Sequence, residues 1–202
     1  MNPTVEVIKQ LRSETGAGVM ECRKALEQND QNLEKALAYL QEMAAIKAKK
    51  QTDRAAHEGK IEVYSHNNGR IGVMVEINTE TEFASRSETF RHFAHEIALQ
   101  ITSASPLYIR DEDIPQHILE EQERTASEKA RRAGKSERII AQIVDGVLEK
   151  YKNKHVLLRQ VYIRDENITV AQLLSKTINH IGENIVIRRF MRWEICPDNE
   201  PE

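Results

Sequence analysis

A short Asn-Gly turn between two strand-like segments restricts the fold more than any other feature of the sequence. Ile61–Tyr64 and Ile71–Ile77 are rich in β-branched residues, and Asn67-Asn68-Gly69 separates them. Asn-Gly between two such segments is the strongest short-range signal of a β-hairpin. Alternate residues of the second segment are apolar and share one face of the strand: Ile71, Val73, Val75 and Ile77. The chain is therefore expected to contain an antiparallel sheet.

The first 45 residues predict three short helices. Asn2 is the expected N-cap of the first helix, with Pro3 in its first turn. Gly16 and Gly18 end the helical pattern before the second helix, because glycine adopts backbone angles that other residues avoid. A bundle of three such helices is marginally stable alone. Residues 46–58 are polar and lack an apolar stripe, which predicts a helical extension followed by a linker.

Helices and strands then alternate without a regular βαβ rhythm, which favours an α+β fold over a doubly wound sheet. Ser85 with Glu88, and Thr169 with Gln172, match the capping box that opens a helix. The other predicted segments are a loop at 78–84, helices at 115–132 and 136–151, an extended segment at 156–161, and a strand at 185–195. The predicted domains are an N-terminal three-helix domain with its linker helix, residues 1–52, and an antiparallel hairpin-containing α+β core, residues 53–202.

The charge balance argues against a protein that mainly binds nucleic acid. Lys plus Arg is 29 and Asp plus Glu is 32, a net charge of −3, whereas nucleic-acid-binding domains usually carry a basic excess. No apolar stretch approaches the roughly 20 residues that span a bilayer, and the N-terminus does not resemble a signal peptide. Cys22 and Cys196 lack zinc-site spacing and fit a reducing compartment, with a single bridge between them as the alternative. We expect a cytosolic protein that binds neither membranes nor nucleic acid.

The candidate catalytic motifs are all incomplete. Gly134-Lys135-Ser136 resembles the end of a phosphate-binding loop, but Lys129 stands where that loop requires glycine, so a helix–helix turn is favoured. His92, His95 and Glu96 lack the spacing of a zinc protease, and no Gly-x-Ser-x-Gly sequence is present. We therefore expect no catalytic residue, no metal site and no cofactor.

Phe83 is a large apolar residue in a polar segment between a strand and a helix. It could pack onto the core as a hydrophobic staple, or it could be an exposed anchor for a partner protein. The same two interpretations apply to Arg12, Val19 and Met20 beside the Gly16–Gly18 turn: packing in the helical bundle with one surface charge, or a second partner contact.

Three blocks of the sequence, in order, resemble the bacterial-type translation elongation factor Ts family. They are Leu11–Leu26 near the N-terminus, Glu76–Ala84 around Phe83, and Ile181–Phe190 near the C-terminus. The resemblance implies a guanine-nucleotide exchange factor for the GTPase elongation factor Tu. It also implies a ubiquitin-associated-like three-helix domain followed by an α+β core, which agrees with the pattern of predicted elements.

The resemblance implies two contact regions for the GTPase. In the family the N-terminal domain grips the GTPase domain, and the matching residues here are Lys9, Arg12, Val19 and Met20. A Thr-Asp-Phe-Val loop disturbs the magnesium site and the phosphate site, and the matching residues are Thr81, Glu82, Phe83 and Ala84. Glu82 thus replaces an aspartate and Ala84 replaces a valine, while the aromatic residue is retained.

The chain is short for this family. Longer members hold two related core halves, and short members pair into dimers, so the resemblance implies a homodimer with the strand at 185–195 as a candidate pairing edge. The compartment would be the cytoplasm, or the matrix of a plastid or mitochondrion. Two other hypotheses stay open: a non-catalytic interaction module with a ubiquitin-associated-like domain, and a small enzyme that uses His92, His95 or a pair of acidic residues.

Overall fold

The computed structural model describes residues 3–51 and 54–195. The predicted domain boundary at residues 52 and 53, the predicted N-cap Asn2 and the thiol of Cys196 lie outside these residues. By contact density the chain divides into two compact units. The first contains the N-terminal helices, much of the sheet and the last helix, and the second contains a pair of long helices and the small strands around them.

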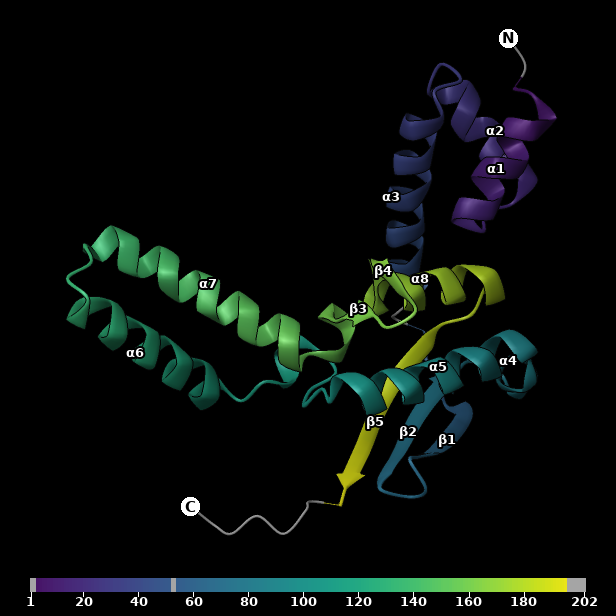
Figure 1. The fold of residues 1–202 in the computed structure, drawn as a ribbon. Helices are drawn as coiled ribbons and strands as arrows, with labels where there is room; N and C mark the ends of the chain where they lie inside the picture. Colours follow the sequence, from purple (N-terminus) through teal and green to yellow (C-terminus); the bar gives the residue numbers. More distant parts are fainter. Residues whose placement is uncertain (1–2, 52–53, 196–202) are drawn as a thin grey trace. The chain divides into compact units, whose positions relative to one another are not determined.

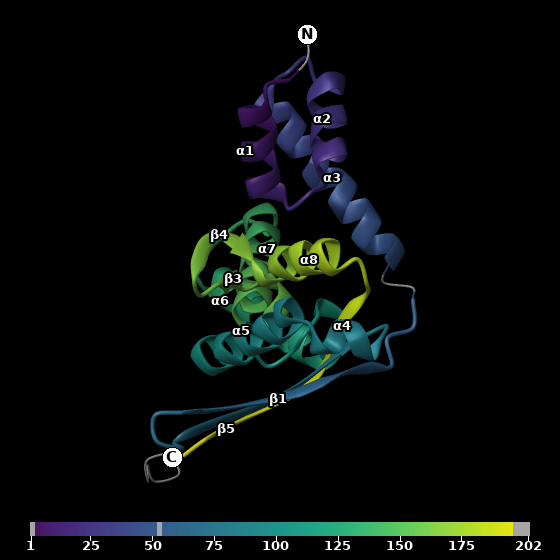
Figure 2. The same cartoon turned by 90° about the vertical axis from the view of Figure 1, so that its right-hand side faces the viewer.

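Three helices form the N-terminal region: α1 (Val5–Thr15), α2 (Val19–Gln28) and α3 (Leu33–Gln51), visible together in Figure 2. Gly16 ends α1 with φ 70°, and its N–H donates to the Arg12 carbonyl. The expectation that Pro3 lies in the first turn is wrong, because Thr4 is the N-cap and Pro3 precedes it. Among the side chains that the structure describes, those buried in the core of the bundle are Leu11, Cys22, Ala25, Leu26, Ala36 and Leu40.

The predicted hairpin is confirmed, and a third strand joins it. The sheet has the order β1 (Glu58–His66), β2 (Ile71–Thr79), β5 (Ile185–Glu194), as Figure 1 shows. Asn67 and Asn68 have φ angles of 51° and 55°, as a tight hairpin turn requires. Contacts between β2 and β5 advance in opposite directions along the two strands, which makes this pair antiparallel as well. The α+β class is therefore confirmed.

The two faces of this sheet have different surroundings. Helix α5 (Glu88–Ala104) covers one face, where Val73, Val75 and Ile77 are buried and where His95 lies against β1. The opposite face carries exposed apolar side chains from all three strands, among them Ile61, Val63, Met74 and Met191. A hollow of about 270 Å³ on that face is lined by Ile61, Met74, Glu76, Arg189, Phe190 and Met191.

The segment expected to be a loop before α5 contains a short helix, α4 (Glu82–Arg86). The predicted capping box at Ser85 and Glu88 is wrong by two residues. Ser87 is the cap of α5, and its Oγ accepts a hydrogen bond from the Phe90 N–H at 3.2 Å. Ser85 is instead buried inside α4, and its hydroxyl donates to the Glu82 carbonyl. Helix α4 contains Ser85, which sequence reasoning gave to the capping box of the next helix.

The second unit contains the helical hairpin of α6 (Gln116–Arg132) and α7 (Glu137–His155), which lie side by side in Figure 1. Both helices lie close to their predicted positions, although α7 runs four residues further than expected. Ile140 and Val144 of α7 are buried against Ala126 and Ala130 of α6. Gly134, with φ 70°, lies in the turn between the helices, which confirms the helix–helix turn interpretation.

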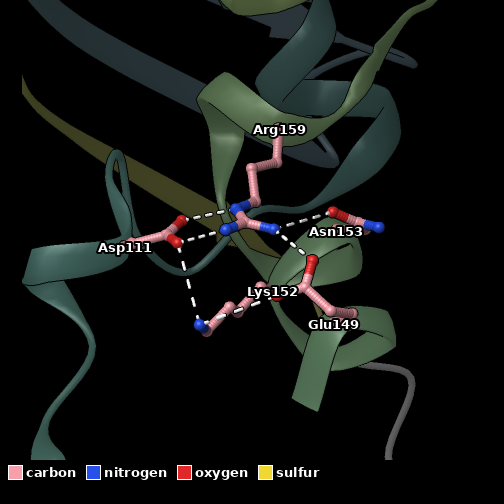
Figure 3. Close-up of polar contacts among 5 residues, drawn as sticks. All are labelled: Asp111, Glu149, Lys152, Asn153 and Arg159. Carbon is pink, nitrogen blue, oxygen red and sulfur yellow. Dashed lines mark hydrogen bonds and ion pairs between the residues drawn. The ribbon is translucent and has the colours of Figure 1, made fainter. Parts of the chain in front are cut away.

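The sequence predicts an extended segment after α7, but Leu157–Arg159 form the single turn η2. Figure 3 shows that Arg159, the last residue of this turn, is held by several polar groups at once. Its Nε donates to Asp111 at 2.7 Å and its guanidinium also reaches Glu149 at 2.6 Å. Asp111 belongs to the short turn η1 (Asp111–Asp113), so this cluster ties two chain segments to the end of α7. Two strands, β3 (Val161–Tyr162) and β4 (Asp165–Thr169), follow and pair antiparallel.

The last helix, α8 (Val170–Ile181), begins directly after Thr169, as its predicted capping residue requires, and Gly182 ends it with φ 82°. Within the described ranges 3–51 and 54–195, no helix combines the length and the apolar character needed to cross a bilayer.

Candidate partner-binding site

Phe83 projects from the first turn of α4 into solvent. Its side chain is 86% exposed, whereas Ala84, the next residue, is 3% exposed and packs inward with Ser85. The interpretation of Phe83 as a hydrophobic staple is therefore wrong. A phenylalanine in solvent leaves a large apolar surface unburied, and such residues at loop tips are typical of interface anchors. Whether Phe83 enters a partner is a prediction that exposure alone does not test.

Thr81 fixes the start of the helix that carries Phe83. It has extended backbone angles, and its Oγ1 accepts a hydrogen bond from the Ala84 N–H at 3.2 Å, which makes it the N-cap. Glu82 follows in the first turn and forms an ion pair with Arg86 in the last turn, where both side chains face solvent. The carboxylate predicted to act at a partner's magnesium site is thus paired within its own helix in the free chain.

A polar cluster lies at the base of α4 and joins it to the start of β5. The Glu183 carboxylate accepts hydrogen bonds from the Thr79 hydroxyl at 3.1 Å, the Thr81 N–H at 3.0 Å and the Thr81 hydroxyl at 2.7 Å. In return, the Asn184 N–H donates to Glu80 at 2.7 Å. Sequence reasoning missed these contacts. Glu183 stood in one of the blocks that resemble the family, but nothing in the sequence linked it to residues about 100 positions earlier.

The second predicted region lies in the N-terminal bundle. Lys9 and Arg12 are one turn apart on α1, Val19 and Met20 open α2, and all four side chains are exposed. Gly18 is the N-cap of α2, and its N–H donates to the Glu21 carboxylate at 3.0 Å. The bundle core is built without Val19 and Met20, so the interpretation that they pack inside the bundle is wrong. A contact with a partner protein stays a prediction for these four residues.

His95, one of the residues considered for catalysis, contacts side chains of β1. His95 Nδ1 lies 3.1 Å from Glu62, and its ring meets Tyr64 edge-on with centroids 5.6 Å apart. Burial raises the pKa of the Glu62 carboxyl, but hydrogen bonds and charge from Lys60 and His95 outweigh burial and hold that pKa below its ordinary value of 4.5. In the parts of the chain that the structure describes, no three His, Cys, Asp or Glu residues form a group that could hold a metal ion.

Comparisons with known proteins agree with the resemblance seen in the sequence. The sequence model of the family described as Elongation factor TS matches residues 4–177. A protein named Elongation factor Ts from Coprothermobacter proteolyticus is 44% identical over 195 residues, which cover 96% of this chain and 99% of that protein. Those from Caldanaerobacter subterraneus subsp. tengcongensis and Rubrobacter xylanophilus are 46% and 45% identical, over 95% and 96% of this chain and 96% and 100% of their own lengths.

Proposed function

The chain belongs to the elongation factor Ts family, and on that premise we propose that it is a guanine-nucleotide exchange factor of translation elongation in the cytoplasm. It binds elongation factor Tu with GDP and promotes GDP release, by displacing Mg²⁺ and disturbing the phosphate site of that GTPase. The observation that carries this proposal is the 86% exposed ring of Phe83 on a helix whose other side is buried. The ring is presented by a capped turn and is free to enter an apolar pocket of a partner.

Exchange requires no bond chemistry from this chain. GDP in a GTPase is held by contacts of the phosphates and by a bridging Mg²⁺. Phe83 needs only to bind a conformation of the partner in which the metal is poorly coordinated. Coupling between two ligands is reciprocal, so a chain that weakens GDP binding is itself released by GDP to the same degree. A differential affinity of about 3–4 kcal/mol would accelerate release several-hundred-fold.

The N-terminal bundle supplies a second contact in this proposal. Lys9 and Arg12 offer positive charge next to the exposed apolar side chains of Val19 and Met20. Apolar anchors beside cations are well suited to a protein surface with its own acidic rim. This region holds the GTPase, while Phe83 acts near the nucleotide.

The open face of the sheet supports the proposed homodimer. The sequence favoured pairing at the edge of the last strand, but the exposed apolar groups lie on a face: Ile61, Val63, Met74 and Met191. Arg189 and Glu76 form an ion pair at 2.7 Å on the same face. A twofold dimer buries the same patch on both copies, so the apolar side chains of this face would meet those of the other copy. We therefore place the dimer contact on this face.

Release of a fluorescent GDP analogue from elongation factor Tu tests the function. Catalytic amounts of the chain should accelerate release, and excess GDP should dissociate the chain from the GTPase. Binding to the GTPase without acceleration would instead support a non-catalytic interaction module. A chain that does not bind the GTPase and does not accelerate GDP release would refute the proposal.

A further inference from the structure

We infer that Glu183 is a positioning residue for Phe83: it holds the helix that presents the ring, although it lies 102 residues away from Thr81 in the sequence. This inference rests on the proposed exchange function and adds to it a residue outside the two predicted contact regions. Glu183 does not need to touch the GTPase for this role.

The first step is the carboxylate itself. Its two oxygens accept three hydrogen bonds, all from the segment that leads into α4: the Thr79 hydroxyl, the Thr81 N–H and the Thr81 hydroxyl. Hydrogen bonds to an ionised acceptor are shorter and stronger than those between neutral groups. The shortest of the three, 2.7 Å, ends on the hydroxyl of Thr81.

The second step passes from Glu183 to the helix through that hydroxyl. A threonine hydroxyl has one proton, and here the proton is donated to Glu183 Oε1. The oxygen lone pairs are thereby turned toward the Ala84 N–H, which donates to the same Oγ1 at 3.2 Å. Thr81 is solvent-exposed, so its hydroxyl would otherwise rotate among water partners. Glu183 orients the N-cap of α4.

The third step is the small size of α4. The helix has five residues, and a helix this short does not form on its own in water. Its position therefore depends on tertiary anchors at its ends. Buried Ala84 and Ser85 supply one anchor, and the Glu183–Thr81 contact supplies the other.

Glu183 is itself held in place. Gly182 ends α8 directly before it, and Asn184 directly after it is completely buried. The Asn184 N–H donates to Glu80, and the Asn184 side-chain amide donates to the Arg54 carbonyl at 2.8 Å. The two segments thus exchange hydrogen bonds in both directions. A ring on such a support loses little conformational entropy when it binds, which raises affinity.

The test is Glu183→Gln in the full chain, because glutamine keeps the size of the side chain and removes its charge and one acceptor oxygen. We expect the exchange rate at subsaturating concentrations to fall about tenfold. Glu120→Gln, which removes a carboxylate exposed on α6, is the matched control and should leave exchange unchanged. Thr81→Val, which removes the hydroxyl that Glu183 holds, should reproduce the loss caused by Glu183→Gln.

A second measurement separates positioning from general stability. In the Phe83→Ala background, Glu183→Gln should cause almost no further loss of exchange, because Glu183 affects exchange only by positioning the ring of Phe83. Losses that multiply independently in the double variant would overturn the inference. So would a Glu183→Gln chain that exchanges at the wild-type rate, or one in which the loss is matched by global unfolding.

Hydrogen exchange of the Ala84 amide keeps the inference distinct from the proposed function. Glu183→Gln should lower protection of this amide at least about fivefold while amides of the α1–α3 bundle keep theirs. If the wild-type chain does not accelerate GDP release, the exchange function fails. The protection of the Ala84 amide still tests whether Glu183 holds the start of α4. Unchanged protection would overturn the inference whatever the exchange assay shows.

Discussion

Phe83 and Ala84 are adjacent in α4, yet the ring of Phe83 is almost fully in solvent and the methyl group of Ala84 is buried. Successive residues of a helix point about 100° apart, so a helix that packs Ala84 and Ser85 inward carries Phe83 on its outer side. Helix α4 thus has both properties that a partner anchor needs: a backbone fixed by packing and a side chain that is free in solvent.

Phe83→Ala should abolish most exchange and leave the fold intact. Removing an exposed ring changes the free energy of unfolding by less than about 0.5 kcal/mol, whereas we expect GDP release to slow at least about 100-fold. Stopped-flow GDP release and thermal unfolding check the two parts. Phe90→Ala is the contrast, because that ring is fully buried and its removal should cost about 3–5 kcal/mol of stability. Equal losses of folding and exchange in Phe83→Ala would contradict the anchor role.

Gly59→Ala should destabilise the sheet. Gly59 has φ 151°, and an added Cβ would lie 2.2 Å from the Ile77 carbonyl oxygen on the neighbouring strand, well inside contact distance. The strands must move apart there, and we expect a loss of about 2 kcal/mol or more. Gly146→Ala is the matched control: it lies within α7 with no heavy atom near the added Cβ, so it should stabilise by up to about 1 kcal/mol. Chemical denaturation of both variants checks the contrast, and a neutral Gly59→Ala would refute the predicted steric clash.

Arg159→Lys should weaken the attachment of the α6–α7 hairpin. A lysine cannot reproduce the forked contacts of Arg159 with Asp111 and Glu149 that Figure 3 shows. We expect a loss of about 1–2 kcal/mol, with hydrogen-exchange protection reduced in η2 and at the end of α7. Arg124→Lys, whose ion pairs on α6 are exposed, should leave stability unchanged. Similar behaviour of the two variants would show that the Arg159 cluster contributes no more than surface charges.

His155 should make stability depend on pH. Burial lowers the pKa of His155 below its ordinary value of 6.5, and its Nδ1 has no hydrogen-bond partner among the described residues. The folded chain therefore binds this proton less readily than the unfolded chain. The stabilising contribution is complete above pH 6.5 and is lost as the pH falls from there toward the lower folded-state pKa.

His155→Phe should flatten the pH dependence below pH 6.5 and keep the ring contact with Tyr151. Urea unfolding at several pH values checks this. A His155→Phe chain with the wild-type slope would show that another group is responsible.

Met191→Glu should convert the proposed dimer into a monomer, because it places a charge in the apolar hollow of the open sheet face. Analytical ultracentrifugation measures the change. Trp193, the only tryptophan, lies two residues further along β5 and is 66% exposed, so its emission should shift to the blue as wild-type chains associate. Ile139→Glu introduces the same charge on α7 and should leave association unchanged. A wild-type chain that stays monomeric at high concentration would refute the dimer.

Local sequence patterns predicted most of the elements. The Asn-Gly turn identified the hairpin, Gly16 marked the end of α1, and Thr169 marked the start of α8. Errors occurred where two local signals competed. Ser85 and Ser87 can both cap a helix that begins near Glu88, and the burial of Ser85 within α4, which no local pattern encodes, selects Ser87.

The sequence by itself determined the class of fold and the turns, because these depend on neighbours a few positions apart. Its resemblance to the family implied which residues carry the proposed contacts. Only the tertiary structure decided that Phe83 faces solvent, that the apolar residues of β1, β2 and β5 share an open face, and that Glu183 holds Thr81. These relationships depend on segments up to about 100 residues apart meeting in space, and that meeting is set by packing of the whole core rather than by any local preference.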